Sequence, residues 1–231
     1  MNRLILDTET ANGLDCPLPY DIGYSIFDDD TGETLLERSF VVAEIFLDTE
    51  LMAGAYYADK VPQYWDDITE GVRTLRSIRT IRRIFWNDLK TYGVKAIGGY
   101  NMGFDTRAVR NDIRYITASF LRWFIPYGID LFCIWNMACT SILSTHEYID
   151  FALAHNLVSG KGNILTSAEA VYKYLQNDED FSESHTGLED VRIEKEIYFA
   201  VKRSGLNYDE SVKASPWQKV RKYYKNEYKG E

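Results

Sequence analysis

The stretch from Leu4 to Thr10 constrains the fold of this chain more than any other part of its sequence. It reads Leu-Ile-Leu-Asp-Thr-Glu-Thr, so a run of aliphatic residues ends abruptly in two acids, Asp7 and Glu9. Continuous aliphatic residues are typical of a strand buried inside a sheet. Side chains two positions apart on a strand point to the same face, so the two carboxylates are expected side by side. Adjacent carboxylates resist ionising together unless a cation lies between them. The stretch predicts a metal site or, more simply, two solvated acids.

The composition is that of a folded protein with a sizeable core. Of 231 residues, 45% are hydrophobic and 14% aromatic, which favours one globular domain with room for an insertion. Because no apolar run has the length of a membrane span, we expect a cytoplasmic protein with no membrane association. The three cysteines, Cys16, Cys133 and Cys139, contain no CxxC pair and are interpreted as free thiols.

The charge is negative overall but unevenly distributed. A net charge of −9 argues against a protein that coats nucleic acid nonspecifically, because such binding depends on Lys and Arg. The net charge remains compatible with an enzyme that holds only the end of a nucleic-acid strand. Two basic clusters can either follow a phosphate backbone or form solvated helix faces. The first comprises Arg73, Arg76, Arg79, Arg82 and Arg83, and the second comprises Lys213, Lys219, Arg221, Lys222, Lys225 and Lys229.

The pattern of apolar residues places strands first and helices later. Residues 21–27 and 34–42 are predicted as strands that follow the first in an antiparallel meander. Residues 44–70 are interpreted as an insertion of one or two short helices, rich in Tyr and Trp, that forms a flap over the sheet edge. The spacing of apolar residues predicts a helix over 71–90, and a buried strand over 95–100 follows it. This order favours an α/β sandwich with a mixed sheet.

Several helix starts carry acids or capping residues. Asp105 is expected in the first turn of a helix that follows strand 95–100, where the helix dipole favours a negative charge. Asp130 is predicted to cap the next helix, and Thr166 with Glu169 resembles a capping box. Asp190 lies in the first turn of the last long helix.

Four carboxylates therefore stand out by their structural context: Asp7, Glu9, Asp105 and Asp190. Hard oxygen ligands of this kind favour Mg²⁺ or Mn²⁺ over zinc. Two such ions about 4 Å apart can ligate a phosphodiester, one activating a water and the other stabilising the leaving oxygen. His185, five residues before Asp190, has the intrinsic pKa of a general base.

The sequence resembles the DEDDh 3′→5′ exonucleases, which include polymerase proofreading subunits and oligoribonucleases. The resemblance is carried by Asp7-Thr8-Glu9-Thr10, Asn101-x-x-Phe104-Asp105 and His185-x-x-x-x-Asp190, in that order. It implies a ribonuclease H-like α/β fold with a five-stranded mixed sheet flanked by helices. It also implies a site for two ions on the four acids, with His185 as base, and contacts of the terminal nucleotide with Thr10, Asn101 and Phe104.

Some residues depart from the family pattern. The loop after Thr10 reads Ala-Asn-Gly-Leu where the family often has Thr-Gly-Leu. Gly187 replaces the more usual Ala, and we expect it to loosen the start of the last helix. The aromatic pairs of residues 44–70 resemble those of stand-alone phage exonucleases, and residues 206–231 form a basic C-terminal extension beyond an exonuclease domain at 1–205.

The sequence predicts a metal-dependent exonuclease that releases nucleoside 5′-monophosphates from single-stranded DNA 3′ ends. An RNA trimmer is the alternative within the same class, because no residue reports on a 2′-OH. A non-catalytic module that binds a nucleic-acid end is the alternative from another class. A polymerase or replication protein is a candidate partner. The resemblance allows a homodimer, and no pattern fixes the oligomeric state.

Overall fold

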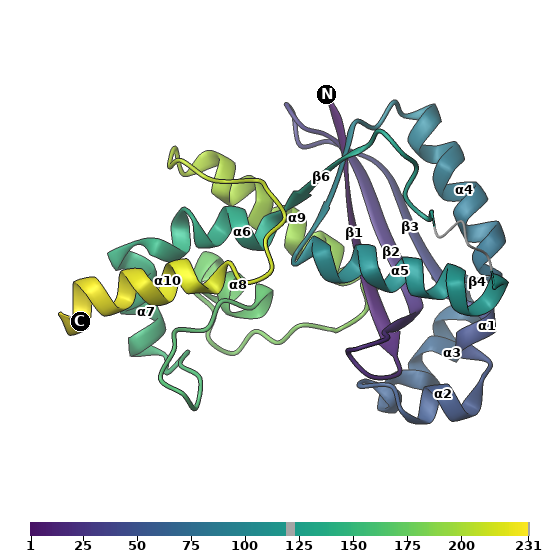
Figure 1. The fold of residues 1–231 in the computed structure, drawn as a ribbon, viewed down its shortest axis with the longest axis horizontal. Helices are drawn as coiled ribbons and strands as arrows, with labels where there is room; N and C mark the ends of the chain where they lie inside the picture. The colour runs from purple at the N-terminus through teal and green to yellow at the C-terminus, as the bar shows by residue number, and fades with distance from the viewer. Residues whose placement is uncertain (119–122, 231) are drawn as a thin grey trace. The chain divides into compact units, whose positions relative to one another are not determined.

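The computed structural model describes residues 1–118 and 123–230 and divides into two compact units (Figure 1). The first unit contains Met1–Gly98, Phe104–Asp130 and Ser184–Val191, and the second contains Gly99–Gly103, Leu131–Glu183 and Arg192–Glu231. Among the described residues, no helix has the length and apolar character needed to cross a membrane.

A mixed sheet of six strands, in the order β4-β3-β2-β1-β5-β6, organises the fold. β1 pairs antiparallel with β2 and parallel with β5, β2 pairs antiparallel with β3, and β3 pairs parallel with β4. The predicted mixed α/β sheet is confirmed, with six strands instead of five. The strands are β1 Asn2–Ala11, β2 Leu18–Asp28, β3 Thr34–Val42, β4 Thr74–Arg76, β5 Ala96–Gly99 and β6 Asp130–Cys133.

The additional strand, β4, lies in a segment that we predicted as the first turns of a helix. Helix α4 spans Ile78–Thr91, and the side chain of Ser77 caps it. Val72, which the predicted apolar stripe included, is 54% exposed, whereas Arg73 is 2% exposed. The prediction was wrong here because the ion pairs of buried Arg73 hold this segment in an extended form beside β3.

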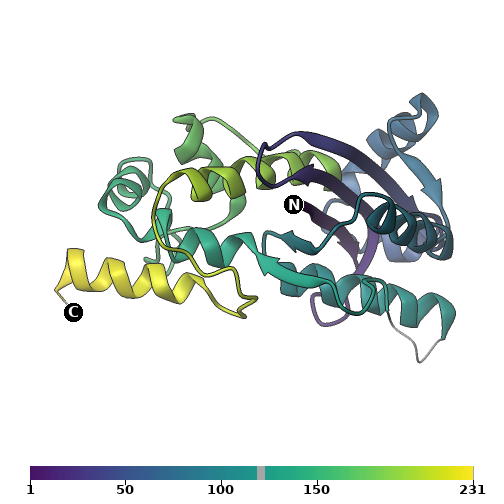
Figure 2. The same ribbon diagram turned by 90° about the horizontal axis from the view of Figure 1, so that it is seen from above.

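The two faces of the sheet meet different helices (Figure 2). On one face, Phe85 of α4 packs edge-on against Tyr24 of β2 with ring centroids 5.2 Å apart. Helix α5, Met102–Thr117, approaches the same face, where Thr8 contacts Asp105. On the opposite face, the first turn of α9, Gly187–Arg203, packs against β2. The strand residues between these helices form the core of the first unit.

The flap predicted over residues 44–70 is helical, as expected, but it contains three helices and a 3-10 turn where one or two helices were predicted. Its aromatic residues form part of a small core, because Tyr64 is buried and contacts Phe46, which also contacts Trp65. Tyr56 is 86% exposed. The elements are α1 Ala43–Phe46, α2 Thr49–Ala53, the 3-10 turn η1 Ala58–Lys60 and α3 Val61–Glu70.

The second unit is helical, and two predicted caps in this part of the chain are wrong. Asp130 begins β6 and its backbone N–H donates to the carbonyl of Lys95, so the cap of the next helix is Cys133. Ser167 caps α8 through Ala170 N. Thr166 instead accepts a hydrogen bond from Trp135 Nε1. The helices are α6 Ile134–Cys139, η2 Ile142–Ser144, α7 His146–Ala154, α8 Ala168–Gln176 and the later turns of α9.

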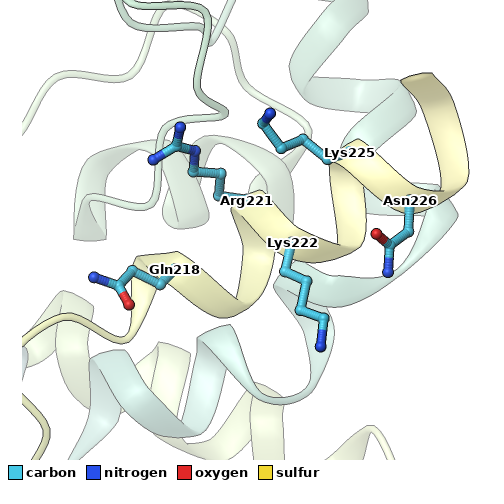
Figure 3. A pocket seen from close by; sticks show the side chains of 5 residues that line it. All are labelled: Gln218, Arg221, Lys222, Lys225 and Asn226. Carbon is cyan, nitrogen blue, oxygen red and sulfur yellow. The ribbon is translucent and has the colours of Figure 1, made fainter. Parts of the chain in front are cut away.

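The basic C-terminal extension forms helix α10, Trp217–Tyr224, and a π-helical turn, η3, over Lys225–Lys229. Val220 is buried, and the hydroxyl of Tyr228 donates to Asp150 at 2.7 Å. A hollow of about 480 Å³ lies on the basic side of this helix (Figure 3), lined by Gln218, Arg221, Lys222, Lys225 and Asn226. The proposed domain boundary after residue 205 stays a prediction, and the last residue, Glu231, lies outside the described residues.

Candidate active site

Strand β1 carries the first two predicted acids. Asp7 pairs with Gly23 and Glu9 with Asp21 in the register with β2, and a β-bulge follows between Glu9 and Thr10. The alternation of side chains along a strand puts Asp7 and Glu9 on one face and Thr8 on the other. The central position of β1 in the sheet therefore holds both acids on a rigid element.

Asp105 lies in the first turn of α5, as predicted, and is almost fully buried. Its carboxylate accepts a hydrogen bond of 2.8 Å from the hydroxyl of Thr8. Burial raises the pKa of Asp105 to about 7, although the bond from Thr8 acts in the opposite direction. Thr8, between the two acids of the first motif, thus links that motif to the second.

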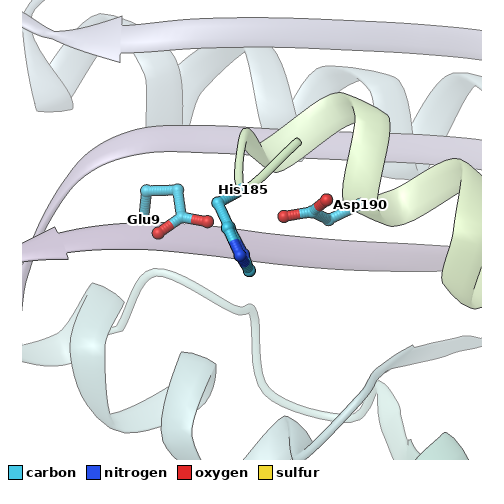
Figure 4. A group of neighbouring side chains, drawn as sticks. All are labelled: Glu9, His185 and Asp190. Atoms are coloured by element: carbon cyan, nitrogen blue, oxygen red, sulfur yellow. The ribbon is translucent and has the colours of Figure 1, made fainter. Parts of the chain in front are cut away.

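His185 and Asp190 meet Glu9 from the other end of the sequence. His185 lies in the loop before α9, Asp190 lies in the first turn of that helix, and both side chains lie beside Glu9 (Figure 4). One ligand atom from each of the three lies within 4.8 Å of the others. Residues that are more than 170 positions apart in the sequence are therefore close enough to hold one ion.

The carboxylates of this cluster are strongly perturbed. Burial raises the pKa of Glu9 to about 9, and the charges of Asp190 and Asp21 raise it further. Burial, with Asp21 and Glu189, raises the pKa of Asp190 to about 7. Lys60 of the flap opposes both shifts. Asp105 also contributes to the shift of Glu9, so the acids of all three motifs share one electrostatic environment.

The loop that carries His185 is held in a defined conformation. His185 has a positive φ of 50°, which is uncommon for a residue other than glycine. Its ring stacks on Tyr57, with centroids 4.3 Å apart and planes 13° apart. Thr186 donates to Glu189 at 2.7 Å. The sequence spacing of Thr186 and Glu189 is that of a capping box, so this contact could have been predicted. No local sequence pattern predicts the contact of His185 with Tyr57.

A buried polar network supports the start of α9. Asp21 is fully buried, and one of its oxygens accepts bonds from Tyr64, Arg73 and the backbone N–H of Gly187. Arg73 also donates to Glu189 at 2.8 Å. Asp21 is not among the predicted site residues, although it is an acid at the start of an apolar strand.

Gly187 is tightly packed, contrary to the expectation that it loosens the helix start. Its N–H donates to Asp21 at 2.9 Å. A Cβ at Gly187 would lie 2.8 Å from the backbone nitrogen of Gly23, and a Cβ at Gly23 would lie 2.3 Å from the backbone of Gly187. Two glycines are needed here because helix and strand backbones approach each other closely.

The residues fit a divalent cation. Among the described residues, Asp190 Oδ1 is buried and has no hydrogen-bond partner, as expected of an atom that binds an ion. Burial is the largest cause of the raised pKa values of Glu9, Asp105 and Asp190, and a bound cation would favour the ionised form of each carboxyl. Carboxylate oxygens suit Mg²⁺ or Mn²⁺. The predicted ligand role of Asp7, on the same face of β1 as Glu9, is compatible with this arrangement.

The predicted substrate contacts stay predictions. Thr10 follows the bulge of β1, and the ring of Phe104 lies under the guanidinium of Arg107 at 5.6 Å. Asn101 belongs to the second unit and has a left-handed φ of 70°.

Comparison with solved structures identifies the architecture. The chain is similar to a 3′-exonuclease whose structure is described as 3′-end-specific recognition of a histone mRNA stem-loop. The identity is 13%, the TM-score is 0.54, and the match covers 92% of this chain and 87% of that chain. It is also similar to cell-death related nuclease 4, with 12% identity, a TM-score of 0.55, and coverage of 97% and 77%. The fold is ribonuclease H-like.

A third similar structure is E. coli exonuclease I in complex with an oligonucleotide, with 13% identity and a TM-score of 0.52. The match covers 88% of this chain but only 40% of exonuclease I. At these identities the likenesses establish the fold and leave the activity open. The sequence matches no protein-family model and no curated protein.

Proposed function

We propose that the protein is a metal-dependent 3′→5′ exonuclease that releases nucleoside 5′-monophosphates from single-stranded DNA ends. The observation that carries the proposal is the convergence of Glu9, His185 and Asp190 within 4.8 Å, from the first and third motifs. Buried Asp105 of the second motif adds to the same electrostatic environment. A ribonuclease H-like fold shared with nucleases supports the same reading.

The acids Asp7, Glu9, Asp105 and Asp190 would hold two divalent ions, Mg²⁺ or Mn²⁺. When bound, these ions supply positive charge that makes a water more acidic and stabilises negative charge on the phosphate oxygens. Strand β1 and helices α5 and α9, which carry the four acids, fix where this charge can lie, and this would align the terminal phosphodiester with the attacking water.

His185 would act as the general base. Its imidazole accepts a proton from the water as the water oxygen attacks phosphorus, and the bond from phosphorus to the 3′ oxygen breaks. The 3′ oxygen then takes up a proton from solvent. The stack on Tyr57 holds the ring of His185 beside the carboxylates, so the base needs little reorganisation.

The proposal is tested with 5′-labelled single-stranded DNA and Mg²⁺ or Mn²⁺. We expect shortening in steps of one nucleotide that EDTA abolishes and that His185→Asn and Asp190→Asn reduce by at least roughly 10²-fold. The matched control is His155→Asn, which changes a histidine paired with Glu179 in the second unit and should keep full activity. Internal cutting, or full activity in His185→Asn, would contradict the proposal.

The choice between DNA and RNA is decided by parallel assays. One of the similar structures is described with an RNA stem-loop and another with a DNA oligonucleotide. We therefore compare rates on strands of identical sequence, and a faster rate on RNA would identify an RNA-trimming enzyme. End binding without any hydrolysis in either metal would instead identify a binding module.

A further inference from the structure

The arginine cluster of residues 73–83 separates in the structure into groups with different environments. Arg73 is buried in the network behind the active site, and Arg82 lies over the ring of Trp86. Arg76 and Arg83 instead line a common pocket with Arg38 of β3. The sequence cluster is therefore not one continuous basic helix face.

This pocket lies where β3, β4 and α4 meet. Its volume is about 600 Å³, which is in the range of pockets that bind small ligands. Phe40 and Ile84 give it an apolar surface. All the residues that line it belong to the first unit, and they are Arg38, Phe40, Thr74, Arg76, Arg83, Ile84, Asn87 and Asp88.

The pocket has an excess of positive charge. Asp88 is the one acid among the described lining residues, and it is buried. Its Oδ2 already accepts from the hydroxyl of Tyr24 at 2.8 Å and from Arg38 Nε at 3.2 Å. Asp88 thus orients Arg38 and offsets one of the three guanidinium charges. The remaining excess stands out in a protein with a net charge of −9.

We propose that this pocket binds the phosphate backbone of the substrate strand at a position separate from the catalytic carboxylates. Guanidinium groups form paired hydrogen bonds with phosphate oxygens, and Thr74 and Asn87 add a hydroxyl and an amide. The apolar surface of Phe40 and Ile84 can contact a sugar or base. The register of β2 with β3 places Arg38 and Phe40 on the sheet face that carries Tyr24, opposite Glu9, so a bound strand must pass around the sheet to reach both sites. This inference rests on the proposed exonuclease function, and it predicts tighter binding of strands long enough to do so.

The test compares Arg76→Gln/Arg83→Gln with Arg79→Gln/Arg110→Gln. The control changes two exposed arginines that do not belong to the described lining, and it removes the same charge. Binding of fluorescein-labelled dT4 and dT20 is measured by anisotropy in EDTA, over a series of salt concentrations. Equal unfolding midpoints establish that each variant is folded.

We expect the pocket variant to bind dT20 roughly tenfold more weakly and dT4 as tightly as the wild type does. Its salt dependence should fall by about 1.4 in the slope of log K against log salt, because each phosphate contact with a single strand contributes about 0.7. Equal losses in the pocket variant and the control, or equal losses for dT4 and dT20, would overturn the proposal. Thymidine 5′-monophosphate is tested as a competitor of dT20. If it displaces dT20 from the wild type but not from the pocket variant, the pocket is a product site instead.

Hydrolysis of the 4-nitrophenyl ester of thymidine 5′-monophosphate separates this inference from the proposed function. This substrate is too short to reach a second site, so the pocket variant should hydrolyse it at the wild-type rate. If the wild type and both arginine variants hydrolyse neither this ester nor DNA, the exonuclease proposal fails. The anisotropy measurements still decide whether the pocket binds a strand.

Discussion

Gly23→Ala is the substitution for which the structure predicts the sharpest effect on the candidate site. The added Cβ would lie 2.3 Å from the carbonyl carbon of Gly187 and from the nitrogen of Leu188, whereas ordinary contacts begin at 3.4 Å. The start of α9 must therefore move by about 1 Å, and His185 and Asp190 move with it. A displacement of this size can reduce a rate by about 10²-fold. Overpacking should also lower the free energy of unfolding by about 1–3 kcal/mol.

The assay is single-turnover shortening of a 5′-labelled DNA strand by one nucleotide with saturating Mg²⁺. Gly13→Ala is the control, because a Cβ there meets nothing within 4 Å in the described part of the chain. Gly187→Ala should resemble Gly23→Ala, even though alanine is usual at this position in the family that the sequence resembles. A Gly23→Ala protein with the wild-type rate and an unchanged unfolding midpoint would refute the reasoning.

Four further predictions concern the buried carboxyls, the metal site and the ring stack on His185. Among the described residues, both carboxylate oxygens of Asp112 are buried without a partner, and burial raises the pKa of Asp112 well above its usual value. This carboxyl destabilises the fold increasingly as pH rises above the pKa that it has in the unfolded chain. Asp112→Leu should therefore raise the free energy of unfolding, measured in urea, by about 1–3 kcal/mol at pH 7 and by less at pH 4. The pKa values of Glu9, about 9, and Asp190, about 7, are also raised, so thermal stability in EDTA should fall as pH increases from 5 to 9. Mg²⁺ at 100 times its Kd should add about 2.7 kcal/mol to the free energy of unfolding at neutral pH. An unfolding midpoint that Mg²⁺ leaves unchanged would count against the metal site. Tyr57→Ala should lower kcat at least roughly tenfold, and at most by the 10²–10⁴-fold that a general base contributes, whereas Tyr57→Phe and Tyr56→Ala should leave kcat unchanged. Equal losses in all three variants would exclude the stack as the cause.

The sequence signals that point to the candidate site are local, and the structure brings Glu9, His185 and Asp190 together. A buried strand that ends in acids is visible in residues 4–10, and so are the acids at the helix starts of α5 and α9. The strand and helix boundaries then bring Glu9 and Asp190 together by the topology of the fold. The convergence could be expected without knowledge of the side-chain contacts.

Features that depend on distant partners were missed or misread. Arg73 belongs to a periodic arginine series, but its ion pairs with Asp21, Asp67 and Glu189 hold it in the interior and replace a helical turn by β4. The stack of Tyr57 on His185 joins positions 128 residues apart and leaves no local trace. Tertiary contacts overrode local propensity at these positions.

The bond from Gly187 to Asp21 spans 166 positions of the chain, which has a consequence for biosynthesis. A ribosome that adds about 5–20 residues per second needs roughly 8–33 seconds to extend the nascent polypeptide from one residue to the other. For most of that interval the emerging chain contains the residues of β1 and β2 but lacks His185 and Asp190. If the protein degrades nucleic acid, its incomplete chains cannot damage the message or genome of the cell that makes them.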